Sequence, residues 1–246
     1  MKVIILAAGF GTRLGKFSEN IPKGLITDQN NNSLLGKLLS DLQTIPNFNN
    51  SEGATIITNA RDYDKYANYL KENNLDISLI NNNILTVETS LGALNDLLFA
   101  IEQKNWQAED ILVLPSDTYY EFKLTDFIIF AKSKNSLITV VNDIQNKNLI
   151  KNRLGCAVLD NDKIISFEEK PNEPKSSLAA IPFYYYPTEF LINLKNYLAE
   201  IRTSSSPGDI IPWLLQKNIT IYAYVATGKY LDVGTVKELE KLKQIS

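Results

Sequence analysis

Short apolar runs alternate with segments of helical apolar spacing through the first half of the chain, and this alternation constrains the fold most. An unbroken apolar run of this length is typical of a strand that is covered on both faces of a sheet. The expected strands are residues 3–6, 54–58, 111–114 and 137–141. The expected helices are residues 34–45, 62–73, 92–103 and 124–132. The alternation predicts an α/β fold with an open, doubly wound sheet and helices on both faces.

The second half of the chain departs from this alternation and predicts a mixed sheet. The strand-like segments are residues 156–159, 163–167, 180–186 and 219–225. The helical segments are residues 188–201, 208–217 and 236–244. We expect the later strands to form a small β lid over the first half. The length of 246 residues is compatible with a single domain.

The composition excludes several kinds of chemistry. The chain has no His and one Cys, which rules out His-based proton transfer, disulfides within the chain and metal sites built from His or Cys. The net charge is −3 and no basic stripe is visible, so we expect no nucleic-acid partner. Because no apolar run approaches the roughly 20 residues of a membrane helix, we expect no membrane partner and a cytoplasmic localisation.

A glycine-rich loop follows the first strand directly. Its sequence is Ala-Ala-Gly-Phe-Gly-Thr-Arg-Leu, from residue 7 to residue 14. Gly9 and Gly11 allow a sharp turn that brings N–H groups close to phosphate oxygens, and Thr12 and Arg13 add a hydroxyl and a planar cation. A dinucleotide-binding fingerprint would need Gly where this chain has Leu14. A tight turn with a surface Arg remains the alternative for this loop taken alone.

Three further charged residues stand at the ends of predicted elements. Lys23 follows a proline ten residues after Arg13 and would supply a second cation for a triphosphate. Asp117 follows the strand at 111–114, and Asp232 stands before the last helix. Mg²⁺ commonly binds one or two carboxylates together with phosphate oxygens, so this pair could hold it. Taken singly, each Asp could instead be a helix N-cap and Lys23 a surface side chain.

A charged loop with two prolines follows the strand at 163–167. It contains Glu169 and Lys170, within Phe-Glu-Glu-Lys-Pro-Asn-Glu-Pro-Lys. Glu169 could accept hydrogen bonds from sugar hydroxyls, and Lys170 could pair with a phosphate monoester. Taken alone, the loop is also compatible with ordinary solvated charges.

Together these motifs resemble the sugar-1-phosphate nucleotidylyltransferase family. The family pattern is Leu-Ala-(Ala/Gly)-Gly-x-Gly-Thr-Arg, a Pro-Lys pair, an Asp after an apolar strand, a Phe-x-Glu-Lys-Pro loop and a late (Trp/Tyr)-x-Asp-x-Gly-Thr. All of these occur in this order between Leu6 and Thr235, and residues 166–186 are most similar to the glucose-1-phosphate thymidylyltransferase branch. The resemblance implies a Rossmann-like, GT-A-like fold in one domain, residues 1–246. Its nucleotide-binding half would be residues 1–135, and residues 136–246 would bind the sugar phosphate.

The resemblance also implies an activity, transfer of a nucleotidyl group from an NTP to a sugar 1-phosphate in nucleotide-sugar and polysaccharide biosynthesis. Arg13 and Lys23 would be the catalytic residues, and Asp117 and Asp232 would hold Mg²⁺ as the cofactor. The sugar phosphate would contact Gly155, Glu169 and Lys170. The nucleotide would contact Leu6, Ala8, Gly9, Gly11, Thr12, Arg13, Glu88 and Gly92. Assembly into a homo-oligomer stays open.

Several departures from the family pattern leave the base and the sugar open. Val87 stands where a Gln often reads a pyrimidine, and Pro182 stands where the thymidylyltransferase branch has Gly. Ala8 is frequent in uridylyl- and cytidylyltransferases, whereas the surroundings of Glu88 resemble guanylyltransferases. One alternative is a cytidylyltransferase that acts on phosphocholine, with the tyrosines at 184–186 as an aromatic cage. The other is a catalytically silent nucleotide-sugar sensor of the same fold.

Overall fold

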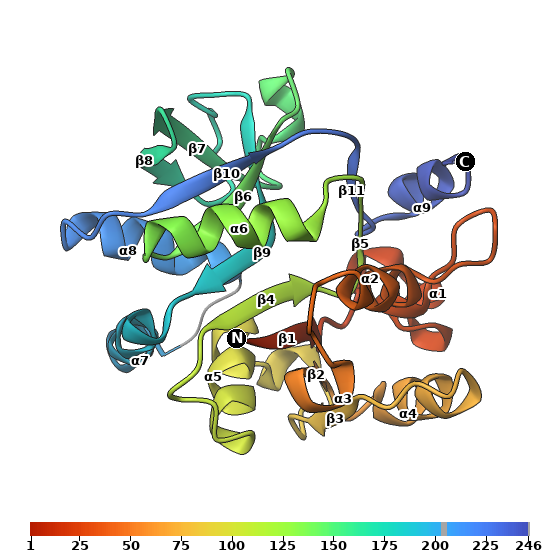
Figure 1. The fold of residues 1–246 in the computed structure, drawn as a ribbon. Coiled ribbons are helices and arrows are strands. Elements are labelled where there is room, and N and C mark those ends of the chain that lie inside the picture. Colours follow the sequence, from red (N-terminus) through yellow and green to blue (C-terminus); the bar gives the residue numbers. More distant parts are fainter. Residues whose placement is uncertain (203–205, 246) are drawn as a thin grey trace. The chain divides into compact units, whose positions relative to one another are not determined.

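The computed structural model describes residues 1–202 and 206–245 (Figure 1). The chain divides into two compact units. We call residues 2–90, 114–124 and 228–246 the N-terminal unit. Residue 1 together with residues 91–113 and 125–227 forms the central unit. Each unit is therefore assembled from segments that are far apart in the sequence.

The N-terminal unit is built on parallel strands in the order β3-β2-β1. These strands are β1 (Lys2–Ala7), β2 (Ala54–Thr58) and β3 (Ser78–Asn81). The apolar runs at 3–6 and 54–58 correctly predict β1 and β2, and every residue of β2 is buried. Sequence reasoning missed β3, since polar residues stand at both of its ends and all of its residues are only half-buried.

Helices and a short ladder complete the N-terminal unit. The helices are α1 (Lys16–Asn20), α2 (Leu34–Gln43), α3 (Asn50–Gly53), α4 (Tyr63–Glu72) and α9 (Val236–Leu242). Helix α2 begins where the Ser33 side chain accepts a hydrogen bond from the Gly36 N–H at 2.9 Å. The ladder pairs β5 (Thr118–Tyr120) with β11 (Tyr230–Asp232) in antiparallel fashion. It joins two segments that are about a hundred residues apart in the sequence.

The central unit contains a mixed sheet with the strand order β4-β9-β6-β10-β8-β7, in which β7 also pairs with β9. The strands are β4 (Ile111–Pro115), β6 (Ile138–Asp143), β7 (Gly155–Asp160), β8 (Lys163–Glu168), β9 (Leu178–Tyr186) and β10 (Tyr222–Ala226). Leu114 and Pro115 of β4 belong to the N-terminal unit. β6 and β10 are parallel, whereas β9 runs antiparallel to β4 and β6. The expected mixed α/β architecture is therefore confirmed.

The helices of the central unit lie close to their expected ranges. They are α5 (Ala93–Gln103), α6 (Leu124–Lys134), α7 (Leu191–Glu200) and α8 (Ile210–Gln216). α7 and α8 each begin a few residues late because a 3-10 turn precedes them. The later strands, expected to form a lid, are hydrogen-bonded to one another in one sheet. Their role as a lid stays a prediction.

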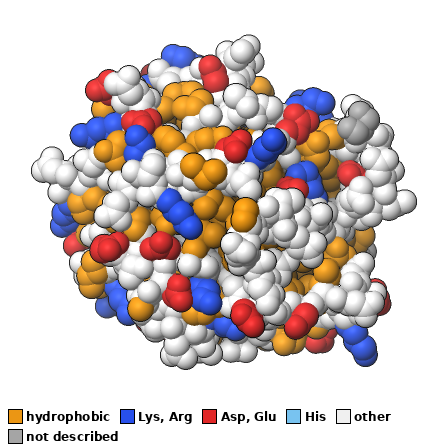
Figure 2. All heavy atoms as spheres, in the orientation of Figure 1, with side chains coloured by type: hydrophobic (Ala, Val, Ile, Leu, Met, Phe, Trp, Pro, Cys, Tyr) orange, Lys and Arg blue, Asp and Glu red, His pale blue; other side chains and the backbone are white. Residues whose placement is uncertain are grey.

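The surface carries interspersed charges, with acidic and basic side chains side by side on the face shown in Figure 2. Within the described part of the chain, no helix is long and apolar enough to cross a membrane.

Candidate functional site

The glycine-rich loop leaves β1 and turns sharply at Gly11. The φ angle of Gly11 is 64°, in the left-handed region that favours glycine. A Cβ atom at this position would lie 2.9 Å from the Cβ of Ser18 and 3.3 Å from the Cγ of Lys23. The loop therefore packs directly against the stem of Lys23. Thr12 and Arg13 follow in a 3-10 turn, Thr12–Leu14, and both are exposed.

Lys23 begins a second 3-10 turn, Lys23–Leu25, and forms an ion pair with Asp117. The side chains are 16% and 20% exposed, so the pair is largely withdrawn from water. Burial pulls the pKa of Lys23 down, but the carboxylates of Asp117 and Asp232 outweigh it and raise this pKa above its usual value. Lys23 therefore stays a cation whose charge is directed at the two carboxylates.

The β5–β11 ladder brings the two predicted metal ligands together. Asp232 pairs with Thr118 in the ladder, and the N–H of Val233 donates to the carbonyl of Asp117 at 3.2 Å. Burial and then the charge of Asp117 raise the pKa of Asp232, against the opposing effect of Lys23 and Arg13. Two carboxylates thus repel each other in a partly desolvated place.

Arg13 reaches the same place from the glycine-rich loop. A Cβ atom on Gly234 would lie 2.9 Å from Nη2 of Arg13 and 3.5 Å from Oδ2 of Asp232. The N-terminal unit therefore brings four of the predicted site residues close together, namely Arg13, Lys23, Asp117 and Asp232. Among residues 1–202 and 206–245, no group of three or more His, Cys, Asp or Glu side chains could hold a metal ion. The two Asp are then the candidate ligands, with phosphate oxygens and water as the others.

The other predicted nucleotide contacts are partly backbone positions. The carbonyl of Leu6 accepts a hydrogen bond from the Ser116 N–H at 3.1 Å, and Gly9 is exposed with open space around its Cα. Glu88 lies exposed in a 3-10 turn, Val87–Thr89, where its own N–H lowers its pKa. Gly92 belongs to the central unit and precedes α5 with a φ of 90°.

A second cluster, in the central unit, surrounds the carboxylate of Glu169. Added Cβ atoms on Gly155 and Gly208 would lie 3.0 Å and 2.6 Å from Oε2 of Glu169, so both glycines leave it room. Burial raises the pKa of Glu169, while Lys170 and a hydrogen bond with Ser206 oppose this effect. The structure thus brings two of the predicted site residues, Gly155 and Glu169, together.

Lys170 lies at the edge of this cluster. Its backbone adopts a φ of 48°, unusual for a residue other than glycine, and its side chain is 42% exposed. The distance from Nζ to Oε1 of Glu169 is 3.8 Å, which is a loose ion pair. The ammonium group is therefore available to a ligand.

Sequence reasoning missed several residues that lie around the two clusters. In the central unit these are Ser206 and Gly208; a Cβ on Gly208 would lie 3.3 Å from the hydroxyl of Tyr184, a residue that the sequence suggested only as part of a cage. In the N-terminal unit they are Asn59, Arg61 and Tyr66, which contact the glycine-rich loop or the Lys23 turn, and Asp62, which hydrogen-bonds with Asn59 and Arg61. One signal could have found Asn59, because it directly follows a parallel strand.

The three tyrosines considered as a cage do not surround one point. Tyr184 and Tyr186 are both buried, with ring centroids 6.3 Å apart. Tyr185 points to the other face of β9, as strand alternation requires, and its hydroxyl donates to Asp110 at 2.6 Å. This geometry does not favour a quaternary-amine ligand.

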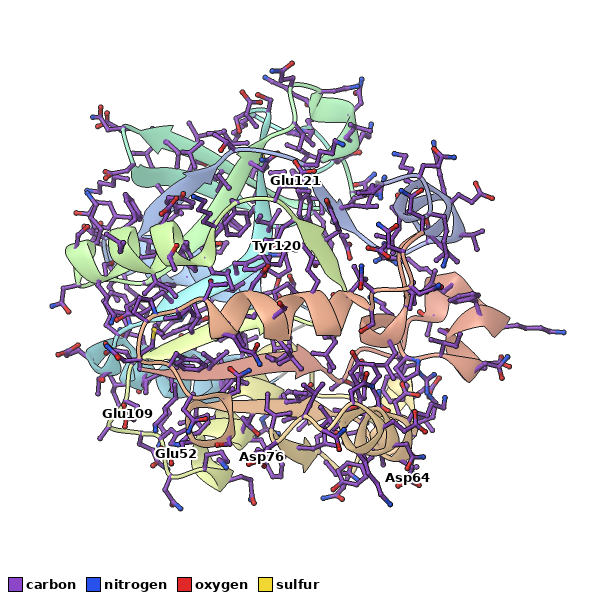
Figure 3. The ribbon with its side chains drawn as sticks, turned by 45° about the vertical axis from the view of Figure 1, so that its right-hand side comes forward. Glu52, Asp64, Asp76, Glu109, Tyr120 and Glu121 are labelled. Atoms are coloured by element: carbon purple, nitrogen blue, oxygen red, sulfur yellow. The ribbon has the colours of Figure 1, made fainter. Side chains whose placement is uncertain are left out.

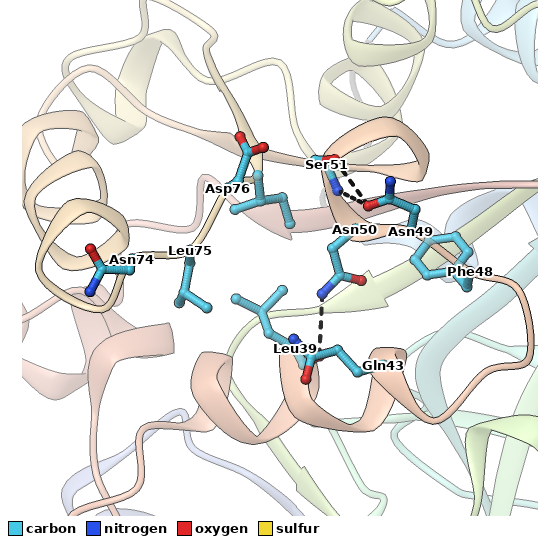
Figure 4. Close-up of a pocket in the computed structure, with 10 residues that line it drawn as sticks. Leu39, Gln43, Phe48, Asn49, Asn50, Ser51, Asn74, Leu75 and Asp76 are labelled. Carbon is cyan, nitrogen blue, oxygen red and sulfur yellow. Dashed lines mark hydrogen bonds between the residues drawn. The ribbon is translucent and has the colours of Figure 1, made fainter.

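The N-terminal unit has a hollow of about 440 Å³ (Figure 4). None of the residues that line it is a predicted site residue. Its lining comes from the end of α2, from α3 and from the turn after α4. Asn50 bridges part of this lining through a long hydrogen bond of 3.5 Å to the carbonyl of Leu39. No predicted role attaches to this hollow.

Comparison with solved structures places this chain in a known fold. A Bacillus anthracis protein assigned as a glucose-1-phosphate thymidylyltransferase, crystallised with sucrose, superposes with a TM-score of 0.80 at 22% identity. The superposition covers 99% of this chain and 94% of that one. The likeness shows a shared fold. A family model described as nucleotidyl transferase matches residues 2–245, and the chain therefore belongs to this family.

Curated relatives carry more specific names. A glucose-1-phosphate adenylyltransferase of Clostridioides difficile is 28% identical over 258 residues, which cover 97% of this chain and 64% of the relative. A Sulfolobus acidocaldarius protein assigned as a mannose-1-phosphate guanyltransferase is 26% identical over 244 residues, covering 98% of this chain and 62% of that protein. The chain thus spans less than two thirds of the length of these relatives.

Proposed function

We propose that this chain transfers a nucleotidyl group from an NTP to a sugar 1-phosphate and releases pyrophosphate. The observation that carries the proposal is the meeting of two cations and two carboxylates beside a glycine-rich loop, namely Arg13, Lys23, Asp117 and Asp232. Relatives named for adenylyl and guanylyl transfer to sugar phosphates support it. A chain without His can carry out this reaction, as the chemistry below explains.

The proposed reaction is a direct displacement at phosphorus. An oxygen of the sugar phosphate attacks the α-phosphorus of the NTP, and a new phosphorus–oxygen bond forms. The bond from the α-phosphorus to the oxygen that leads to the β-phosphate breaks, and pyrophosphate leaves with that electron pair. A phosphate monoester carries about −1.5 to −2 charges at pH 7. The nucleophile is therefore already an anion, and no general base is required.

Catalysis would then consist of positioning and of charge stabilisation. We assign the phosphates of the NTP to the loop around Gly9, Gly11 and Thr12, with Arg13 and Lys23 as the cations that balance the charge developing at the α-phosphorus. The nucleoside would lie against the backbone of Leu6 and Ala8. Glu88 and Gly92 remain the proposed contacts to the base or the ribose.

Asp117 and Asp232 fit a divalent cation, and we assign Mg²⁺ to them. The raised pKa of Asp232 reflects burial and repulsion from Asp117, and a cation held between the two would relieve both. When bound there, Mg²⁺ would neutralise phosphate charge. The two carboxylates would hold the ion, and Lys23 sets the position of Asp117 through their ion pair.

The sugar phosphate would bind at the Glu169 cluster. The exposed ammonium of Lys170 would pair with its phosphate, and the carboxylate of Glu169, next to Gly155, would accept from sugar hydroxyls. Lys170→Ala should therefore raise the KM for sugar 1-phosphate strongly while leaving NTP binding nearly unchanged. Equal effects on both substrates would contradict this assignment.

One assay tests the whole proposal. Five NTPs are mixed pairwise with a panel of sugar 1-phosphates and Mg²⁺, and pyrophosphate release is measured. We expect turnover for at least one pair, and loss of that turnover in Arg13→Lys. Nucleotide binding without pyrophosphate release for any pair would favour a silent sensor instead. We also retain three predictions from the sequence. They are a cytoplasmic localisation, assembly into a homo-oligomer, and a single domain whose two functional halves meet at residue 135.

A further inference from the structure

The segment from Asn59 to Tyr66, which joins β2 to α4, contacts both loops that carry the predicted cations. We infer that this 59–66 segment positions the glycine-rich loop and the Lys23 turn for phosphate binding. The inference rests on the proposed function, because it assigns the segment a part in that same site. The segment supplies positioning residues, and its contacts are with the two loops themselves.

Two side chains of the segment hold carbonyl groups of the glycine-rich loop. Nδ2 of Asn59 donates to the carbonyl of Ala8 at 3.0 Å, and Nη2 of Arg61 donates to the carbonyl of Phe10 at 3.1 Å. The guanidinium carbon of Arg61 also lies 5.0 Å from the centre of the Phe10 ring. Asn59 is fully buried, so its bond is shielded from water.

Holding these carbonyls also orients the N–H groups that phosphates would need. In a planar trans peptide, the N–H points away from the carbonyl of the preceding residue. The Ala8 carbonyl therefore fixes the direction of the Gly9 N–H, and the Phe10 carbonyl fixes that of Gly11. Because both carbonyls face the 59–66 segment, both N–H groups face the opposite way. Because glycine has no side chain that restricts its backbone, contacts from outside the loop contribute more to the orientation of these peptides.

Asp62 is the centre of the segment and holds Arg61 in place. Its carboxylate is buried and accepts from Nε and Nη2 of Arg61 at 3.1 and 2.6 Å, and from Nζ of Lys65 at 3.1 Å. Its N–H donates to Oδ1 of Asn59 at 2.9 Å. A buried carboxylate needs such partners, and the planar fork of Arg61 meets both oxygens at once. Asp62 thereby fixes the side chains that reach Ala8 and Phe10.

The other end of the segment holds the Lys23 turn. The hydroxyl of Tyr66 accepts from the N–H of Gly24 and hydrogen-bonds with the side chain of Ser116. These partners adjoin the two members of the ion pair, since Gly24 follows Lys23 and Ser116 precedes Asp117. One residue earlier, Nζ of Lys65 donates to the carbonyl of Glu19 at 2.7 Å and so holds α1, between the two loops.

The test uses two variants that keep the shape of the segment. Arg61→Lys retains the charge beside Asp62 but cannot form the fork and reach Phe10 as well. Tyr66→Phe removes only the hydroxyl. Asp64→Asn is the matched control, because Asp64 lies exposed on α4, the helix that also carries Tyr66 (Figure 3). The readouts are the Kd of tripolyphosphate, which avoids the unknown base, the KM for each substrate and the urea unfolding midpoint.

We expect both variants to weaken tripolyphosphate binding about tenfold or more, since small misplacements in a site can cost up to about 10²-fold. The KM for sugar 1-phosphate should stay at the control value. Binding within threefold of the control, or equal losses for both substrates, would overturn the inference. If Tyr66→Phe proves unstable, Arg61→Lys decides, because Arg61 is 29% exposed. A wild-type chain that fails to bind tripolyphosphate would instead refute the proposed nucleotide site.

Discussion

Single residues without side chains determine where the predicted cations lie. Gly11 leaves room for the stem of Lys23, and Gly234 leaves room for the guanidinium of Arg13. The two glycines come from opposite ends of the chain. The family pattern Asp-x-Gly-Thr therefore includes a position, Gly234, whose use is steric and not chemical.

Gly234→Ala should displace Arg13 at little cost in stability. The added Cβ would lie 2.9 Å from Nη2, the far end of a flexible side chain that can move aside. Because the displaced guanidinium no longer meets the phosphates as before, we expect turnover to fall by about tenfold or more. Steady-state kinetics and a urea unfolding curve measure the two effects. Unchanged turnover in Gly234→Ala would contradict the steric role.

Asp232→Asn should abolish metal-dependent turnover while the fold remains. The carboxylate is a proposed Mg²⁺ ligand, and the loss of one such electrostatic group costs about 10²–10³ in rate. Burial already raises the pKa of Asp232, so a neutral amide should not destabilise the fold. A Mg²⁺ titration of pyrophosphate release compares the variant with the wild type. Full turnover of the wild type in excess EDTA would contradict the metal assignment.

At the scale of elements, short irregular pieces hold the site more than the long helices do. The β5–β11 ladder has three residues in each strand, yet it joins the segments of Asp117 and Asp232. The turn at Lys23–Leu25 is packed between Tyr66 and Ser116 through Gly24. The charges of the candidate site thus depend on pieces of structure that are themselves tightly packed.

Gly24→Ala should destabilise the N-terminal unit. The added Cβ would lie 2.9 Å from the Tyr66 hydroxyl, 3.0 Å from the Cβ of Ser116 and 3.1 Å from the Ser116 carbonyl. These neighbours are buried, and the carbonyl is backbone, so the turn must shift. Overpacking of this kind costs about 1–3 kcal/mol. Urea denaturation followed by circular dichroism measures the change in the free energy of unfolding. A stability equal to that of the wild type would mean that the turn yields easily.

Glu169→Gln should stabilise the protein more at pH 7 than near pH 4. Burial raises the pKa of Glu169 in the folded state above the unfolded value, about 4.3. The stability that the protonated carboxyl contributes is therefore present below the unfolded pKa and is lost as the pH rises through the folded pKa. Gln is neutral at every pH, so the Gln variant does not lose this contribution to stability as the pH rises. Urea unfolding of both proteins at several pH values gives the difference, and a constant difference would contradict the raised pKa.

At the scale of the whole molecule, the chain runs back and forth between its two units. The N-terminal unit consists of three separate segments of the sequence. The stretches of chain between those segments belong to the central unit. Neither unit is a continuous piece of sequence. We expect from this connectivity that the two unfold together, because neither unit can unfold without releasing chain ends that the other holds.

The positions of the tryptophans allow this to be tested. Trp106 and Trp213 both lie in the central unit, and the chain has no other Trp. Their fluorescence therefore reports on that unit alone, whereas far-ultraviolet circular dichroism reports on the entire chain. Cooperative unfolding predicts coincident urea transitions by the two methods. A circular dichroism transition that begins at lower urea than the fluorescence transition would show independent unfolding of the N-terminal unit.

Features that depend on local pattern could be predicted from the amino-acid sequence. The apolar runs predicted β1, β2 and β4, and helical spacing predicted α2, α4 and α5, because burial imposes a period on the residues of each element. The glycine-rich loop and its Arg13 could also be recognised in the sequence, because a sharp turn needs glycine at particular positions. Strand β3, with polar ends and half-buried residues, lacked such a pattern.

Which of these residues come into contact depends on the folded arrangement of distant segments. The ion pair of Lys23 and Asp117 joins positions 94 residues apart, and the register of the β5–β11 ladder adds Asp232 to it. The bonds from Asn59 and Arg61 to the glycine-rich loop each cross 51 residues. No local period encodes such contacts, because they depend on how strands align and how side chains pack between distant segments. The sequence thus named the charged residues, while packing selected the buried neighbours that hold them.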